Sequence, residues 1–269
     1  MWKKKVLLSV LMILLAMSAA ACTQQKNNSN NTDTKIEKKQ SKSNNKKPSV
    51  KKNASKTILS ELKNSNQKSL TYYALGDSLS VGLFSNTEQT RFTSLFANDL
   101  RKGTGKKVTE DNNSSVGKTV TNFGLPNVQN LITANPDIVT IEFGTNDSAY
   151  GVDAKNLGDF VTNMDSVVRQ VKSQTNAKIL LMTTWSPSDG KYISNDAVYD
   201  REIKRIGNKY GVPVVDLSMI WRNNPSVTEN DLGYSKVYNI QKDNFHPNQL
   251  GHDKIAKLLY ETVKNQEVK

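Results

Sequence analysis

Residues 70–79 read LTYYALGDSL, an apolar run that ends abruptly in Gly76, Asp77 and Ser78. A short apolar run closed by turn residues predicts a strand buried on both faces. The other expected strands are residues 108–110 (weak), 138–143, 179–184 and 212–217. The expected helices are residues 91–102, 128–134, 157–173, 197–210 and 249–264. This alternation predicts an α/β fold, a three-layer α/β/α sandwich with a roughly five-stranded parallel sheet.

Polar residues gather where the expected strands end. Ser78 follows the first strand, and residues 144–147 (GTND) follow the third. Because the carboxyl ends of parallel strands meet at one edge of a sheet, we expect these groups to lie together. The whole chain has only two histidines, His246 and His252, and His246 has a carboxylate three residues upstream in Asp243. A serine nucleophile needs a neighbouring base, so this pattern indicates a serine hydrolase.

Four blocks of sequence resemble the SGNH, or GDSL, hydrolase family in order and spacing over residues 70–265. The blocks are residues 76–82 (GDSLSVG), 112–119 (NNSSVGKT), 144–147 (GTND) and 243–248 (DNFHPN). The second block departs from the family at Ser114, usually Gly, and at Val116, often Ser. The G-x-S-x-G elbow of ordinary α/β-hydrolases is absent, because Ser80 stands where its second Gly would be. The resemblance implies the flavodoxin-like SGNH hydrolase fold.

The resemblance also implies a role for each site residue. Ser78 would be the nucleophile, His246 its general base and then general acid, and Asp243 the carboxylate that orients the imidazole. The oxyanion hole would comprise the backbone N–H groups of Ser78 and Gly117 and the side-chain amide of Asn146.

Several other polar and aromatic residues receive structural interpretations. Asp216 is the one rival to Asp243 as the triad acid, yet Asp77, Asp147 and Asp216 are all expected mainly to tie loops and helix starts together. His252 lies within the last expected helix and is interpreted as structural. The aromatic residues that could line the pocket, but are more often core, are Tyr150, Trp185 and Trp221. No His/Cys cluster suggests a metal and no Gly-rich loop suggests a phosphate site, so no cofactor is expected.

The first 22 residues are typical of an export signal. Lys3, Lys4 and Lys5 precede an apolar run at residues 6–17, which is shorter than the ~20 residues that span a bilayer. Small residues then lead to Cys22, the only cysteine, and this arrangement resembles the lipobox of bacterial lipoproteins. Ala19 departs from it, because Leu is usual there. The alternative is ordinary cleavage after residues 19–21, with release of the protein.

Residues 23–68 are predicted to be a disordered tether rich in Lys, Asn and Ser, which leaves residues 69–269 as the hydrolase domain. Of 37 basic and 25 acidic residues, 15 and 3 lie in residues 1–70, so the remainder carries 22 of each. The net charge of +12 therefore belongs to the N-terminal part of the chain and does not indicate a nucleic-acid-binding face.

The sequence thus predicts an extracytoplasmic serine esterase, held at the cell membrane by a lipid on Cys22, that acts through an acyl-enzyme without metal or cofactor. The expected substrates are O-acetyl glycans and short acyl or lysophospholipid esters, with acyl thioesters as an alternative. A non-catalytic surface binding lipoprotein on the same scaffold is the other alternative. The presence of Ser78, Asp243 and His246 together favours the enzyme, because a binding protein needs no base aligned with a nucleophile.

Overall fold

The computed structural model describes residues 56–187 and 193–268. The predicted signal, Cys22 and most of the predicted tether lie outside the described residues. Within the described ranges, no helix combines the length and the apolar composition needed to cross a bilayer.

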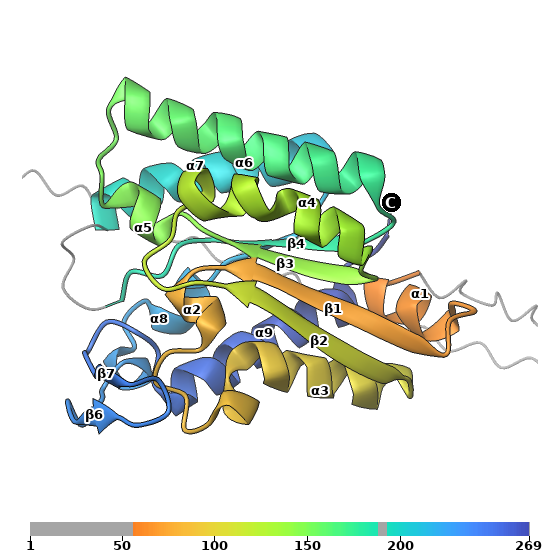
Figure 1. Cartoon of the computed structure of the whole chain (residues 1–269), viewed down its shortest axis with the longest axis horizontal. Helices are drawn as coiled ribbons and strands as arrows, with labels where there is room; N and C mark the ends of the chain where they lie inside the picture. The colour runs from red at the N-terminus through yellow and green to blue at the C-terminus, as the bar shows by residue number, and fades with distance from the viewer. Residues whose placement is uncertain (1–55, 188–192, 269) are drawn as a thin grey trace, which may run out of the picture. The chain divides into compact units, whose positions relative to one another are not determined.

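A parallel sheet of five strands in the order β2-β1-β3-β4-β5 forms the centre of the fold (Figure 1). The strands are β1 (Ser69–Gly76), β2 (Lys107–Ser114), β3 (Ile138–Glu142), β4 (Lys178–Met182) and β5 (Val214–Val215). In this order β1 has β2 on one side and β3 on the other. The connection from β1 to β2 and the connection from β2 to β3 therefore cross opposite faces of the sheet. In sheets of this order, ligands bind in the crevice at the carboxyl ends of the strands where the direction reverses.

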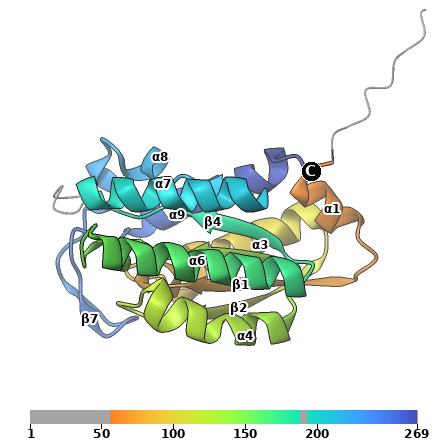
Figure 2. The same ribbon diagram turned by 90° about the horizontal axis from the view of Figure 1, so that it is seen from above.

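Helices cover both faces of the sheet, as the predicted sandwich requires. One face carries α1 (Ile58–Asn64), α3 (Phe92–Thr104), α8 (Ser218–Trp221) and α9 (Gln249–Asn265). The other carries α4 (Leu125–Ala134), α6 (Ala154–Gln174) and α7 (Ile193–Tyr210), which lie side by side in Figure 2. The remaining short elements are α2 (Ser78–Val81), η1 (Glu88–Thr90), η2 (Val120–Gly124), α5 (Thr145–Ser148) and η3 (Pro225–Val227).

The side chains of β1 alternate between two cores. Tyr72 and Ala74 pack among the residues of α3 and α9, whereas Tyr73 and Leu75 pack among those of α4 and α6. Burial of a large apolar side chain contributes roughly 1.5–3 kcal/mol, so a strand that fills both cores is strongly held. The prediction from residues 70–75 of a strand buried on both faces is therefore confirmed.

One expected boundary is wrong, because part of the predicted tether is folded. The helix α1 lies within residues 23–68, and Thr57 caps it by accepting the N–H of Ser60 at 3.2 Å. Ile58 and Leu62 are buried against α3 and α9, and Thr57 forms a β-bridge with Glu267. Residues 57–64 thus belong to the folded part, although they lie before the predicted boundary at residue 69.

A small hairpin precedes the last helix and was not expected. Its strands β6 (Tyr234–Ser235) and β7 (Ile240–Gln241) are antiparallel. It brings the chain to Asp243 and His246, immediately before α9.

Candidate active site

Ser78 occupies the first position of α2, directly after β1 (Figure 1). The side chain of Asp77 caps this helix, since its Oδ1 accepts the N–H of Leu79 at 3.0 Å. Gly76 permits the close approach at this turn, because a Cβ there would lie 2.3 Å from the Ser80 hydroxyl oxygen. The tight turn therefore fixes the position of the Ser78 side chain.

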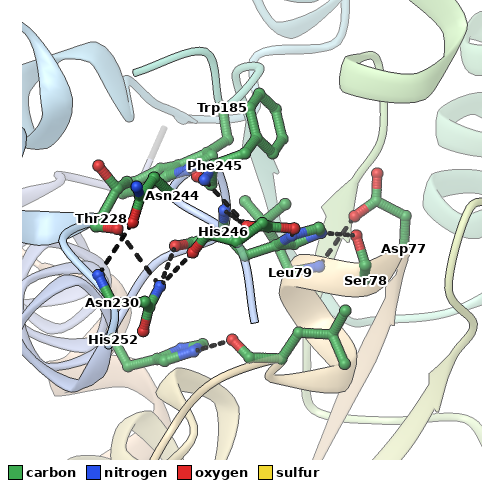
Figure 3. Close-up of polar contacts among 12 residues, drawn as sticks. Asp77, Ser78, Leu79, Trp185, Thr228, Asn230, Asn244, Phe245, His246 and His252 are labelled. Atoms are coloured by element: carbon green, nitrogen blue, oxygen red, sulfur yellow. Dashed lines mark hydrogen bonds and ion pairs between the residues drawn. The ribbon is translucent and has the colours of Figure 1, made fainter. Parts of the chain in front are cut away.

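Three side chains form a continuous hydrogen-bonded chain, of which Figure 3 labels Ser78 and His246. The Ser78 Oγ lies 2.9 Å from His246 Nε2, and His246 Nδ1 lies 2.8 Å from Asp243 Oδ2. A carboxylate only accepts, so Asp243 draws the ring proton to Nδ1 and leaves Nε2 free to accept the Ser78 hydroxyl proton. Partial burial raises the pKa of the Asp243 carboxyl, but hydrogen bonds from His246 outweigh it and hold that pKa below its usual value. The structure thus brings the three predicted residues together.

The loop of residues 243–246 is held by its own backbone and by Trp185. Asp243 Oδ1 accepts the N–H groups of Phe245 at 2.9 Å and of His246 at 2.8 Å. The indole N–H of Trp185 donates to the Phe245 carbonyl at 2.7 Å, and Asn230 Nδ2 donates to the Asp243 carbonyl at 2.8 Å (Figure 3). Trp185 is fully buried, so it is a core residue that also fixes the loop bearing His246.

The three predicted oxyanion donors have different surroundings. The Ser78 N–H is the first of a helix and has no intrahelical acceptor. Asn146 Nδ2 donates to Asp77 Oδ2 at 2.8 Å and to the Lys118 carbonyl at 3.0 Å, so an ester oxygen would have to replace or share one of these acceptors. Gly117 is exposed and has a φ of 72°, a left-handed conformation that favours glycine. Asn146 is thus linked to the turn bearing Ser78 through Asp77.

A buried carboxyl pair behind the turn was not anticipated from the sequence. Glu142 pairs with Gly76 across β3 and β1, and its Oε2 accepts from the Asp77 N–H at 3.2 Å and the Ser80 hydroxyl at 3.0 Å. Burial first, and then the charge of Asp77, raise the pKa of Glu142 well above its usual range. Burial also raises the pKa of Asp77 to about 6. A glutamate inside the apolar run IVTIEF was the available signal, since a strand buried on both faces seldom carries a charge.

The other two aspartates tie segments together, as expected. Asp147 accepts the N–H groups of Val120 at 3.2 Å and Gly144 at 3.1 Å, and burial raises its pKa to about 7. Asp216 bonds to Lys204 at 2.7 Å and accepts the N–H of Ser218 at 3.1 Å instead of reaching His246, which removes it as the rival of Asp243. In the described part of the chain, no group of three or more His, Cys, Asp or Glu side chains is arranged to hold a metal ion.

His252 is a buried structural residue, as expected. Its Nε2 lies 2.9 Å from the Leu83 carbonyl, and its Nδ1 accepts the N–H of Phe92 at 3.3 Å. These partners place the ring proton on Nε2. Burial lowers the pKa of His252 to about 4, so the ring is neutral at pH 7.

Comparison with known proteins gave one family and a set of solved structures. The model of the GDSL-like lipase/acylhydrolase family matches residues 74–254, whereas no curated protein matches the chain. The esterase EstA from Pseudoalteromonas sp. is 20% identical, with 72% of this chain and 96% of that chain covered and a TM-score of 0.56. TesA is 21% identical, with 72% of this chain and 98% of that chain covered and a TM-score of 0.56. Axe2, an acetylxylan esterase from Geobacillus stearothermophilus, is 18% identical, with 74% of this chain and 96% of that chain covered and a TM-score of 0.58. At these identities the solved structures show a shared fold.

Proposed function

Because the chain belongs to the GDSL-like lipase/acylhydrolase family and is an ester hydrolase, we propose that Ser78, His246 and Asp243 are its catalytic triad. The hydrogen-bonded chain from Ser78 Oγ through the imidazole to Asp243 is the observation that carries this proposal. Its two distances, 2.9 and 2.8 Å, lie within the reach that proton transfer between nucleophile and base requires.

The proposed reaction follows from this arrangement. Ser78 Oγ attacks the ester carbonyl carbon while His246 Nε2 takes the hydroxyl proton, and Asp243 stabilises the imidazolium. The C–O bond to the alcohol then breaks, and His246 returns the proton to the leaving alkoxide. Water, deprotonated by His246, attacks the acyl-enzyme and releases the carboxylic acid with free Ser78.

The proposed oxyanion hole consists of the backbone N–H groups of Ser78 and Gly117 and the amide of Asn146. The Asn146 amide hydrogen bond to Asp77 supports this assignment, because it ties the amide to the turn that carries the nucleophile. Loss of one such donor typically lowers the rate by ~10²–10³.

For the substrate, we place O-acetyl groups on glycans first and short acyl or lysophospholipid esters second. Support for the first class comes from Axe2, whose name shows that this fold can carry acetylxylan esterase activity. Acyl thioesters and a binding-only function are the alternatives, and an aligned base and nucleophile favour hydrolysis over mere binding.

A chromogenic ester series tests the proposal. The full chain, its Ser78→Ala variant and a Ser173→Ala control would be assayed on p-nitrophenyl esters from acetyl to dodecanoyl. Ser173 is exposed on α6, so its loss should change the rate by no more than about twofold. Ser78→Ala should lower kcat by roughly 10³-fold or more. Activity that is unchanged in Ser78→Ala would remove Ser78 as nucleophile, and absence of activity on every ester would favour the binding function.

We also propose that the protein is extracytoplasmic and anchored by a lipid on Cys22. The support is the sequence alone: a basic start, an apolar run, small residues and a single cysteine. Fractionation of cells that express the full chain or its Cys22→Ser variant tests this. We expect the first in the membrane fraction and the second outside it. Equal release of both would indicate ordinary signal cleavage.

A further inference from the structure

A cavity of about 240 Å³ lies between η2, α5 and the start of α6. Tyr150 supplies its one aromatic ring, and the other residues lining it carry polar side chains, among them Thr121, Asn122, Lys155 and Asp159. Small-molecule pockets usually measure 300–1,000 Å³ and are mainly apolar. This cavity is smaller, and every side chain that lines it carries a polar atom beside its apolar surface, so it suits one small hydroxylated group with an apolar face better than an acyl chain.

The cavity adjoins the proposed catalytic centre through shared residues. Asp147 lines it, and the preceding residue, Asn146, is the amide that donates to Asp77 beside the nucleophile. Thr119 also lines it, and the preceding residue, Lys118, supplies the other carbonyl that Asn146 contacts. A ligand in the cavity therefore lies against the same two segments that hold the proposed oxyanion donor.

Tyr150 presents its ring from a braced turn. The residue is 66% exposed, yet its N–H donates to the Asp147 carbonyl at 3.1 Å and its carbonyl accepts from Asn156 Nδ2 at 2.9 Å. The carbonyl of the next residue, Gly151, accepts the hydroxyl of the buried Tyr199 at 2.7 Å. An aromatic ring held in water by a fixed backbone leaves apolar area exposed, and the flat face of a ligand ring could bury that area.

The polar side chains around the ring supply both donors and acceptors. The Thr121 hydroxyl accepts from Asn163 at 2.9 Å and keeps its own proton for donation. Asn122 Oδ1 accepts the Thr119 N–H at 2.9 Å, while its amide protons meet no acceptor within residues 56–187 and 193–268. Lys155 Nζ and Asp159 Oδ2 form an ion pair at 2.7 Å, so these two residues together add no net charge. An acyl chain would desolvate these groups without replacing their hydrogen bonds, whereas sugar hydroxyls both donate and accept.

We infer that this cavity is a subsite for one sugar ring of an O-acylated glycan, with the ring stacked on Tyr150 and its hydroxyls bonded to Thr121 and Asn122. The inference rests on the proposed function, and it narrows the substrate from esters in general to esters carried by a neutral glycan. The ester carbonyl would lie at Ser78, and a neighbouring or the same sugar residue would occupy the subsite.

Two substrates separate this subsite from the ester-cleaving centre. The full chain in detergent would be assayed on partially O-acetylated xylooligosaccharides and on p-nitrophenyl acetate, which has no sugar. Tyr150→Ala should lower kcat/KM for the oligosaccharides roughly tenfold, as loss of one aromatic contact implies, and change that for p-nitrophenyl acetate less than about twofold. Tyr150→Phe, which keeps the ring, should stay within about twofold on both. Tyr234→Ala removes a tyrosine of similar exposure, 55%, from the hairpin and serves as the control.

Each other outcome counts against the subsite in a distinguishable way. An equal loss on both substrates in Tyr150→Ala would place Tyr150 in the ester site or the fold. An equal oligosaccharide loss in Tyr234→Ala would show that the effect is not specific to this cavity. Hydrolysis of p-nitrophenyl acetate without hydrolysis of any acetylated oligosaccharide would overturn the subsite and leave the esterase intact. Failure on both substrates would overturn the proposed function and the subsite with it.

Discussion

Each carboxylate oxygen of Asp243 has its own function. Oδ2 bonds the His246 ring, whereas Oδ1 accepts two backbone N–H groups of the loop that carries that ring. An amide at this position would offer a donor to Nδ1 and so favour the wrong tautomer. We expect Asp243→Asn to lower kcat by roughly 10³-fold or more, measured on p-nitrophenyl acetate.

Asp216 provides a matched control for this prediction. Its carboxylate pairs with Lys204 and accepts the N–H of Ser218, so Asp216→Asn should leave kcat within about threefold while removing a partly exposed ion pair. A larger loss in Asp216→Asn than in Asp243→Asn would contradict the assignment of the triad acid.

Burial and the charge of Asp77 both raise the pKa of the Glu142 carboxyl and so favour its neutral form. A glutamine has nearly the same shape and is also neutral. Glu142→Gln should therefore keep kcat/KM within about threefold and the free energy of unfolding within about 1 kcal/mol. Glu142→Ala should cost about 2–4 kcal/mol, since it leaves a cavity and the donors of Asp77 and Ser80 unpaired. Urea unfolding and ester hydrolysis measure both, and a glutamine variant as damaged as the alanine variant would show that Glu142 acts as an anion.

At the residue scale, local motifs and the family resemblance predicted that the three side chains of the proposed triad meet. The turn after an apolar run predicted the place of Ser78, and the three-residue spacing placed Asp243 beside His246. The Asp77–Glu142 pair was harder to predict, because it forms only when strands β1 and β3 are neighbours in this register. The commitment of the Asn146 amide to Asp77 likewise depends on tertiary structure and has no sequence signal.

At the scale of elements, α1 shows how packing overrides local composition. Seven residues are too few for a stable isolated helix, and a polar segment precedes them, so the sequence favoured a disordered tether. The helix is stable because Ile58 and Leu62 are buried in the core that α3 and α9 share. Leu62→Ala should lower the free energy of unfolding by about 2–4 kcal/mol in urea titrations of the full chain.

The control for α1 is the neighbouring ion pair. Glu61 contacts Lys178 at 2.5 Å with about a third of each side chain exposed, so Glu61→Ala should cost no more than about 1 kcal/mol. Equal and small effects of Leu62→Ala and Glu61→Ala would show that α1 is not part of the core.

The strands show the same limit in another way. Apolar runs predicted β1, β3 and β4 closely. The expected second strand was weak and covered only residues 108–110, whereas β2 extends to Ser114 through a polar stretch. Eight residues of β2 pair with β1, and this pairing holds polar residues in strand geometry. An edge strand needs only one partner and one buried face, so its sequence carries less hydrophobic signal.

At the scale of the whole molecule, the strand order places every proposed catalytic group at one edge. Ser78 follows β1 and Asn146 follows β3, the two strands that lie side by side at the reversal of strand order. His246 lies near the C-terminal end of the sequence, three residues before α9, and α9 packs on α3. The alternation of strands and helices predicted this edge, whereas the order of the strands was seen only in the structure.

His252 connects α9 with the distant segment from Leu83 to Phe92, so its ionisation affects the stability of the whole molecule. It lies on α9 and bonds the Leu83 carbonyl and the Phe92 N–H. Burial lowers its pKa from the usual 6.5 to about 4, so between these values the unfolded chain binds more protons than the folded one. Its contribution is therefore full above about pH 6.5 and is lost as the pH falls towards 4. That loss is on the order of 3 kcal/mol.

Buried carboxyl groups change the stability of the fold in the opposite direction over the same pH range. Burial raises the pKa of Asp77 to about 6, of Asp147 to about 7 and of Asp196 to about 6. The folded state then holds more protons, so these groups add stability as the pH falls. The pH profile of the unsubstituted protein is the sum of both effects, and a variant is needed to separate them.

His252→Asn isolates the contribution of the imidazole, because the carboxyls are common to both proteins. The free energy of unfolding of the two chains would be measured by urea titration at half-unit steps from pH 7 to pH 4. The difference between them should shrink by about 3 kcal/mol over that range, since the folded state increasingly resists a proton that the unfolded chain accepts. A difference that stays constant with pH would mean that folding does not shift the pKa of His252. The junction of α9 with the loop at Leu83 would then admit a charged ring.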